Sequence, residues 1–147
     1  MQMDQHKGTI TRITPGLRGF TPKPWGWEDV VTNSKEVNYC LKEIFIKAGY
    51  GTSMHRHPVK DETIMVLEGS LIIEHFQTVA TGPLAVKQKP AQQSRKMRLG
   101  PGEAARIEPD AWHRLTAPLD NTLLVEASTY HDDNDKETME EENVPTA

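Results

Sequence analysis

The feature that most constrains this chain is a pair of histidines, His55 and His57, separated by one residue and set between two glycines. In full, the pattern reads Gly49, five residues, His55-Arg56-His57, four residues, Glu62, six residues and Gly69. Side chains alternate faces in an extended strand, so two histidines at i and i+2 point to the same side. Neither the spacing nor the residue types suit a helix, and the pattern therefore predicts β-structure.

The same stretch predicts a metal site. Imidazole is the commonest ligand of the middle and late transition metals, and a carboxylate a few residues later can turn an oxygen donor toward the same point. A lone histidine, His113, follows where a later strand can cross the first. Together His55, His57, Glu62 and His113 predict a centre for one divalent ion, whether Zn, Mn, Fe, Ni or Co. His6, His75 and His131 match no such spacing and are interpreted as solvated or structural.

Length and composition limit the class of protein. The 147 residues suffice for one domain that buries a core without covalent help. Cys40 is the only cysteine, which favours a reducing compartment, and no apolar run is long enough for a membrane span or a signal peptide. We therefore expect a cytoplasmic protein that does not bind membranes.

The formal net charge of -4 is concentrated at the C-terminal end. Residues 131–147 hold seven acidic side chains against Lys136 alone, and the remainder of the chain is slightly basic. A nucleic-acid surface usually shows a dense basic stripe, so no nucleic-acid partner is expected. The acidic tail is expected to form a helical turn or to be disordered.

Short β-type runs bounded by turn residues follow Tyr39, and no convincing helical period lies between them. The expected strands are Leu41–Lys47, Thr63–Glu68, Ser70–Phe76, Ala104–Ile107 and Thr122–Ala127. The stretch Gln77–Arg98 is expected to be a long loop, whose basic cluster Lys87, Lys89, Arg95, Lys96 and Arg98 is interpreted as solvated. These elements predict an all-β sandwich or small barrel over residues 21–130, with an N-terminal arm at 1–20 and an acidic tail at 131–147.

The arm leads into a proline-rich segment that carries two tryptophans, Trp25 and Trp27. Such a pair can stack on sugar rings, but it more often seals a barrel end or a subunit interface, and we favour the structural role. An arm that crosses to a second subunit would protect exposed edge strands, so we predict a homodimer.

The chain resembles the cupin superfamily, whose first motif, Gly-X5-His-X-His-X3-4-Glu-X6-Gly, it satisfies at every position with Gly49, His55, His57, Glu62 and Gly69. The second motif matches at Gly102 and His113, while Glu108, Asp110 and Ala117 stand where proline, glycine and asparagine are usual. The resemblance implies a jelly-roll barrel, also called a double-stranded β-helix, with a metal inside.

Within cupins the chain is similar to small single-domain proteins of the mannose-6-phosphate isomerase type. The shared segments are Lys23-Pro24-Trp25-Gly26-Trp27-Glu28, Lys47-Ala48-Gly49, Lys60-Asp61-Glu62-Thr63, Leu99-Gly100-Pro101-Gly102-Glu103, Trp112-His113-Arg114 and Glu126-Ala127-Ser128-Thr129. This resemblance implies a metal-dependent isomerase or epimerase that acts on a sugar or sugar phosphate.

Aldose-ketose isomerisation needs a Lewis acid and a group that moves a proton between two carbons. The candidate acid-base residues are Asp61, Lys60 and Glu126, together with Glu43. For a phosphate handle, alternation turns Arg56 and Arg114 away from the metal and leaves Arg106 as the candidate substrate-binding residue. Strict alternation from His113 would turn Arg106 outward too, unless the turn at Pro109 resets the register.

Two other functions are compatible with the same ligand set. A mononuclear iron dioxygenase would bind oxygen beside a chelated substrate, and a non-catalytic module would bind a small polar ligand without turnover. Fold alone does not choose among these three functions, because cupins host many chemistries.

Overall fold

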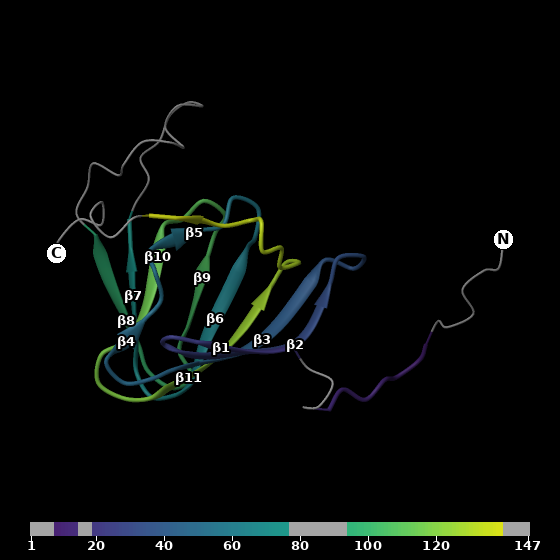
Figure 1. The fold of residues 1–147 in the computed structure, drawn as a ribbon, viewed down its shortest axis with the longest axis horizontal. Coiled ribbons are helices and arrows are strands. Elements are labelled where there is room, and N and C mark those ends of the chain that lie inside the picture. The colour runs from purple at the N-terminus through teal and green to yellow at the C-terminus, as the bar shows by residue number, and fades with distance from the viewer. Residues whose placement is uncertain (1–7, 15–18, 77–93, 140–147) are drawn as a thin grey trace, which may run out of the picture.

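The computed structural model describes residues 8–14, 19–76 and 94–139. These residues form β-strands and turns, and they contain no helix (Figure 1). Every strand pairing is antiparallel, and the strands form two sheets that face each other. The predicted all-β architecture is therefore confirmed. Within the same residues, no helix is long and apolar enough to cross a membrane.

The first sheet has the strand order β1-β2-β3-β11-β6-β9. Its strands are β1 (Gly19–Lys23), β2 (Gly26–Ser34), β3 (Tyr39–Ile46), β11 (Thr122–Ser128), β6 (Glu62–Glu68) and β9 (Ala104–Ile107). The second sheet has the order β12-β5-β10-β7-β8, with β4 also paired to β10. Its strands are β12 (Glu137–Thr138), β5 (His55–Arg56), β10 (His113–Ala117), β7 (Leu71–His75), β8 (Arg95–Leu99) and β4 (Tyr50–Gly51).

The core lies between the two sheets and follows the two-residue alternation of the strands. In β3 every second residue is buried, and β6, β10 and β11 show the same pattern over most of their length. The buried apolar cluster comprises Ile44, Ile46, Ile64, Val66, Leu71, Ile73, Leu99, Ile107, Leu115, Ala117 and Leu124. Burial of this cluster is the main favourable contribution to folding.

Two glycines of the first motif occupy positions that other residues rarely adopt. Gly49 and Gly69 have φ values of +84° and +91°, in the left-handed region. At Gly69 a Cβ atom would also lie only 2.4 Å from the carbonyl oxygen of Asn121. These glycines close the turns at either end of the segment that carries the histidine pair.

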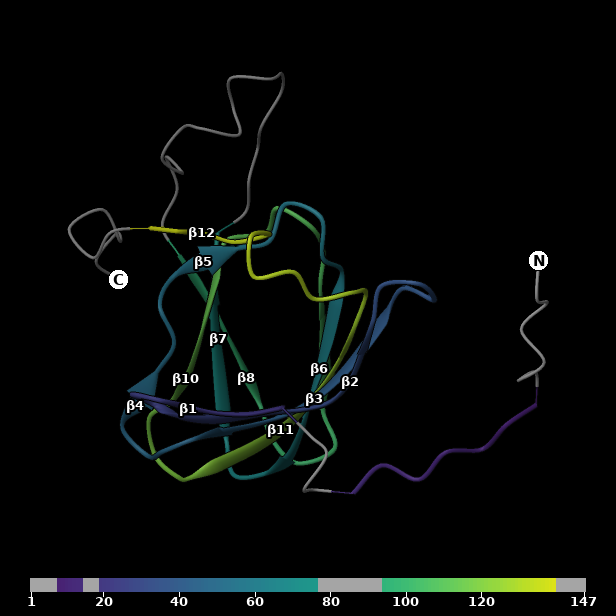
Figure 2. The same ribbon diagram turned by 45° about the vertical axis from the view of Figure 1, so that its right-hand side comes forward.

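Two expectations about local structure are wrong. Residues Arg95–Leu99 form β8 instead of the end of a loop; the strand lies at the sheet edge and buries only Leu99, so it has no alternating apolar signal. The tail carries β12, which pairs with β5 at one end of the barrel, where a helical turn or disorder was expected (Figure 2). The rest of the expected loop, residues 77–93, and the tail from residue 140 lie outside the described residues, as do Lys87 and Lys89.

The N-terminal region divides at β1. Residues 8–14 run away from the barrel, with Ile10 almost fully exposed (Figure 1). Beyond the arm, Trp25 packs against the core cluster, and Trp27 stacks on Phe45 with ring centroids 5.6 Å apart. Both tryptophans thus pack against the barrel, in keeping with the structural role expected for them.

Candidate metal centre

Three histidines meet at the end of the barrel formed by β5 and β10. His55 lies in β5, His57 follows it directly, and His113 begins β10, where it is the register partner of His55. One nitrogen from each ring can be chosen so that all three lie within 4.8 Å of one another. All three residues are buried. Strand pairing thus brings together side chains that are far apart in sequence.

Backbone carbonyls fix the orientation of all three rings. The Nδ1 atoms of His55, His57 and His113 lie 2.7, 2.6 and 2.8 Å from the carbonyl oxygens of Ser53, Asp135 and Ala111. A carbonyl oxygen can only accept a hydrogen bond, so each Nδ1 carries the proton and donates it. In a neutral imidazole the other nitrogen, Nε2, then presents a lone pair. Three Nε2 atoms in one buried group are a ligand set for a cation, which would take the place of the proton between His113 Nε2 and Glu62 Oε1, 3.0 Å apart.

Burial keeps two of these imidazoles neutral. Desolvation, reinforced by the nearby His113, lowers the pKa of His55 to about 3. Desolvation and the charge of Lys60 lower the pKa of His57 to about 4. At neutral pH neither ring needs to lose a proton before it can coordinate an ion.

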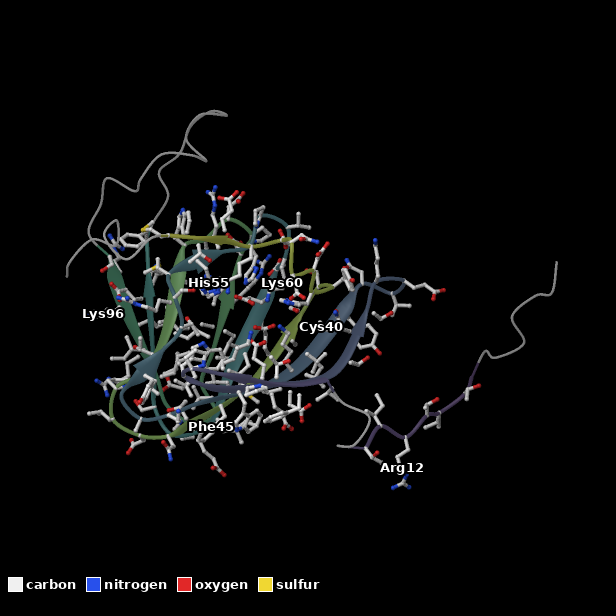
Figure 3. The ribbon with its side chains drawn as sticks, in the orientation of Figure 1. Arg12, Cys40, Phe45, His55, Lys60 and Lys96 are labelled. Atoms are coloured by element: carbon white, nitrogen blue, oxygen red, sulfur yellow. The ribbon has the colours of Figure 1, made fainter. Side chains whose placement is uncertain are left out.

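A buried chain of charges adjoins the histidines. Glu62 Oε1 lies 3.0 Å from His113 Nε2, and Glu62 Oε2 accepts from Lys60 Nζ at 2.8 Å. Lys60 Nζ also donates to Glu126 Oε2 at 3.4 Å. The Glu62 carboxylate does not belong to the group of three mutually close ligand atoms, but it touches one member of that group. His55 and Lys60 are seen at the same end of the barrel in Figure 3.

The two glutamates of this chain differ in protonation. Burial and the neighbouring Glu62 carboxylate raise the pKa of Glu126 to about 7, against the opposing charges of Lys60 and Lys42. Burial also disfavours the charged form of Glu62, but its hydrogen bond to His113 and the charge of Lys60 outweigh burial and lower its pKa. For Lys60, the Glu126 and Glu62 carboxylates outweigh desolvation and raise the pKa. Glu126 is thus the group poised to exchange a proton near neutral pH.

The segment after the last barrel strand completes the site. The backbone carbonyl of Asp135 accepts from His57, and its carboxylate accepts from the backbone N–H groups of Val59 and Lys60 at 2.9 and 2.8 Å. Glu137 Oε2 accepts from Nε of Arg56 at 2.8 Å. Residues 131–139, here named the C-terminal strap, therefore hold the turn that carries His57.

The histidines face a cavity of about 130 Å³ between the two sheets. Lys60, Glu62 and Glu126 also line it, and apolar walls come from Trp25, Ile44 and Leu115. The rest of the lining comes from Lys23, Glu28, Lys42, Thr52, Ser53, His131, Asp133 and Lys136. The cavity thus combines a cation ligand set, acid-base groups and several further polar side chains.

Three of the candidate residues named from the sequence lie elsewhere. Asp61 does not line the cavity; its Oδ2 accepts from the exposed Arg106 at 2.7 Å. Arg106 is the register partner of Thr63, whose side chain is on the solvent face of β6. Glu43 alternates with the buried residues of β3 and lies on the outer face of that strand. Of the candidate acid-base groups, Lys60 and Glu126 are the ones that line the cavity.

The neighbours of the histidines turn away from the cavity, as strand alternation predicts. Arg56 stacks on Trp112, with its Cζ atom 4.9 Å from the ring centroid, and Arg114 pairs with Glu74. Arg56 is nevertheless buried, because the C-terminal strap covers it. Arg56 therefore points away from the cavity and is still shielded from solvent.

The second motif keeps its turn in spite of its departures. Asp110, which stands where glycine is usual, has a φ of +68° and donates its backbone N–H to the carbonyl of His57 at 2.8 Å. Aspartate is among the residues that tolerate this left-handed conformation. The turn before His113 is thus tied directly to the first motif.

Sequence reasoning missed three residues of the site. The first two are the fully buried Lys42 and its partner His131, whose Nδ1 lies 3.2 Å from Lys42 Nζ. The third is Asp135, which anchors the turn after β5. The alternation Cys40, Lys42, Ile44, Ile46 contained the signal for Lys42, because it places a lysine on the buried face of β3. His131 and Asp135 follow the last barrel strand in a polar segment with no alternation.

This geometry defines the chain as a cupin, and the comparisons agree. The sequence profile of the D-lyxose isomerase family matches residues 16–146, nearly the whole chain. The chain belongs to this family, which is of the cupin type. No curated protein sequence matches it significantly.

Solved structures support the same fold. Oxalate decarboxylase from Bacillus subtilis superposes with a TM-score of 0.69 at 14% identity, over 90% of this chain and 33% of the other. KdgF from Halomonas sp. gives 0.63 at 16% identity, over 86% and 98% of the two chains. CapF gives 0.65 at 14% identity, over 84% and 34%. The chain thus spans about a third of the oxalate decarboxylase and CapF chains, and the likeness concerns the fold. The predicted jelly-roll barrel is confirmed.

Proposed function

We propose that this protein is a metal-dependent isomerase that interconverts an aldose and its ketose, with His55, His57, Glu62 and His113 as metal ligands. One observation carries the proposal: all three Nδ1 atoms donate to backbone carbonyls, which leaves the three buried Nε2 atoms as the nitrogens available to a cation. The name of the D-lyxose isomerase family supplies the reaction class.

The residues present fit a divalent transition ion. Imidazole nitrogens and one carboxylate suit zinc, manganese, iron, cobalt or nickel, and the ordered Nδ1 contacts are the usual support for such ligands. When bound, the ion would supply Lewis acidity that polarises a carbonyl oxygen and orients the sugar.

Glu126 and Lys60 are the proposed acid-base pair. Isomerisation moves a proton from the carbon next to the carbonyl to the carbonyl carbon through an enediolate, and the hydroxyl proton passes from one of the two oxygens to the other. Glu126, with a pKa near 7, would take the proton from one carbon and deliver it to the other. Lys60 keeps its proton and would donate a hydrogen bond to the oxygen on which negative charge develops. The apolar walls of Trp25, Ile44 and Leu115 exclude water from this step.

Replacement of a ligand tests the metal centre. His57→Ala and Glu62→Ala should each sharply lower the metal content of the purified protein, measured by mass spectrometry, while the β-rich circular dichroism spectrum remains. Glu43→Ala is the control, because Glu43 lies on the outer face of β3 and does not line the cavity. Unchanged metal stoichiometry in both ligand variants would reject the assignment.

A turnover assay distinguishes the reaction from its alternatives. The metal-loaded protein should interconvert an aldose and its ketose equally well with and without oxygen. Oxygen consumption would indicate the dioxygenase, and retained metal without turnover of any aldose would indicate a binding module. The cytoplasmic location and the homodimer expected from the sequence stay predictions.

A further inference from the structure

Four lysines from separate segments line the cavity: Lys23 at the end of β1, Lys42 in β3, Lys60 before β6 and Lys136 in the C-terminal strap. Lys60 is engaged by Glu62 and Glu126 and belongs to the proposed acid-base pair. The other three have no part in the chemistry described above. They raise the question of what they bind.

The partners of these three lysines are weak or neutral. Lys23 Nζ lies 3.9 Å from Glu28 Oε2, near the limit of an ion pair. Lys42 is 2% exposed, and its Nζ donates a hydrogen bond to an uncharged acceptor, Nδ1 of His131. Within residues 8–14, 19–76 and 94–139, the ammonium group of the exposed Lys136 has no protein partner in an ion pair or a hydrogen bond. An ammonium group offers three donors, so protein acceptors are few on this side of the cavity.

The acidic residues of the cavity do not fill this gap. Glu62 and Glu126 both bind Lys60, although the charge of Lys42 also reaches Glu126. Asp133 bonds to His131; the charges of Lys42 and Lys23 also reach it, but its side chain is almost fully exposed and solvent screens them. Around Lys136, burial and then the charge of Lys23 lower the pKa, with Lys60 and Lys42 acting in the same direction and only Glu28 opposing. A divalent ion on the histidines would add positive charge without adding an acceptor.

We infer that Lys23, Lys42 and Lys136 form a subsite for an anionic group of the substrate, which makes the substrate a sugar that carries a phosphate or carboxylate away from its carbonyl. An oxyanion supplies several acceptors and negative charge at once, and charged hydrogen bonds to it are stronger than those to a neutral hydroxyl. The subsite rests on the proposed isomerase function for its place in the reaction. Its capacity to bind an anion is independent of turnover.

Direct binding gives the first test. Inorganic phosphate, titrated into the full-length metal-loaded protein by calorimetry at low ionic strength, should bind to the wild type. Lys136→Met and Lys23→Met should each weaken this binding about tenfold, the loss expected for one charged hydrogen bond. Lys35→Met is the matched control, since it removes the same charge from an exposed turn outside the cavity.

Substrate selectivity gives the second test and separates phosphate from carboxylate. We expect kcat/KM to be higher for an aldose phosphate or a uronate than for the neutral aldose. The preferred anion identifies the group that the subsite takes. In Lys136→Met and Lys23→Met the ratio of kcat/KM for the anionic over the neutral sugar should fall about tenfold, and in Lys35→Met it should not change.

The two proposals fail in different ways. A neutral aldose preferred over both anionic sugars, with no phosphate binding, would overturn the subsite and leave the isomerase intact. Absence of turnover with any sugar would overturn the isomerase, and calorimetry would still decide on the subsite. Phosphate binding that is equally strong in Lys136→Met, Lys23→Met and Lys35→Met would also overturn the subsite.

Discussion

Four strands carry two kinds of inward-facing side chain, polar at one end of the barrel and apolar at the other. In β3 the buried Lys42 is followed by Ile44 and Ile46, and in β6 the buried Glu62 is followed by Ile64 and Val66. The strand β10 runs from His113 to Leu115 and Ala117, and β11 runs from Leu124 to Glu126. The inward-facing side of each of these strands thus lines the cavity at one end and fills the core at the other.

The two regions contribute in opposite ways. Each apolar side chain in the core adds about 1.5 to 3 kcal/mol of burial free energy. The buried ions of the cavity lose hydration, and their mutual attraction recovers that cost only when every partner is in place. The apolar half of the barrel, with its buried aliphatic side chains, therefore stabilises the fold, and the polar half, which holds the cavity, adds little net stability.

Glu126→Gln should show the largest effect on the polar half. It removes the proposed proton acceptor and leaves the shape of the side chain nearly unchanged, so kcat should fall by about 10² to 10⁴. Metal content and melting temperature should fall far less than kcat. Glu43→Gln, on the outer face of β3, is the matched control. If kcat fell by less than tenfold, Glu126 would not be the base.

Ile64→Ala and Leu124→Ala should show the opposite signature. Both side chains are fully buried in the apolar half, so each change should lower the free energy of unfolding by about 2 to 5 kcal/mol. Metal bound per folded molecule should stay at the wild-type level. Urea unfolding with parallel metal analysis measures both quantities. Leu123→Ala, on the half-buried outer face of β11, should cost less.

The histidine pair and the turns around it could be predicted from the sequence more readily than the segments that cover them. His55 and His57 share a face because strands have a period of two, and Gly49 and Gly69 mark turns that need positive φ. Five strands were predicted with ends within about two residues of those found. These features depend on neighbours in sequence, and local rules suffice for them.

The features that could not be predicted from the sequence depend on contacts between residues that are far apart in the chain. The C-terminal strap is polar and without alternation, yet Asp135 binds the turn after β5 and Glu137 binds Arg56. β8 buries one residue, and β12 contains two. Which acid meets Lys60 was likewise open, because the register of β11 against β6 decides that Glu126 does.

Asp135→Ala tests whether the C-terminal strap belongs functionally to the polar half. Without its carboxylate, the backbone N–H groups of Val59 and Lys60 lose their acceptor, and the carbonyl that orients His57 loses its anchor. Metal affinity should fall by about 10- to 100-fold, the range for groups that orient a ligand. Competition with a chelating dye measures the change. Asp133→Ala, whose carboxylate contacts His131 and not this turn, should leave the affinity within about threefold.

Arg106→Ala should have the smallest effect. It tests whether the solvent-facing pair of Arg106 and Asp61 contributes to the function of the cavity. Arg106 and Asp61 pair on the solvent face beside Glu62, and strand alternation separates them from the cavity. Exposed ion pairs contribute little, so the free energy of unfolding should change by no more than about 1 kcal/mol. We expect kcat/KM to stay within about twofold for neutral and anionic sugars alike, in both Arg106→Ala and Asp61→Ala. A selective loss with anionic sugars in Arg106→Ala would move the anion contact from the lysines of the cavity to this outer surface.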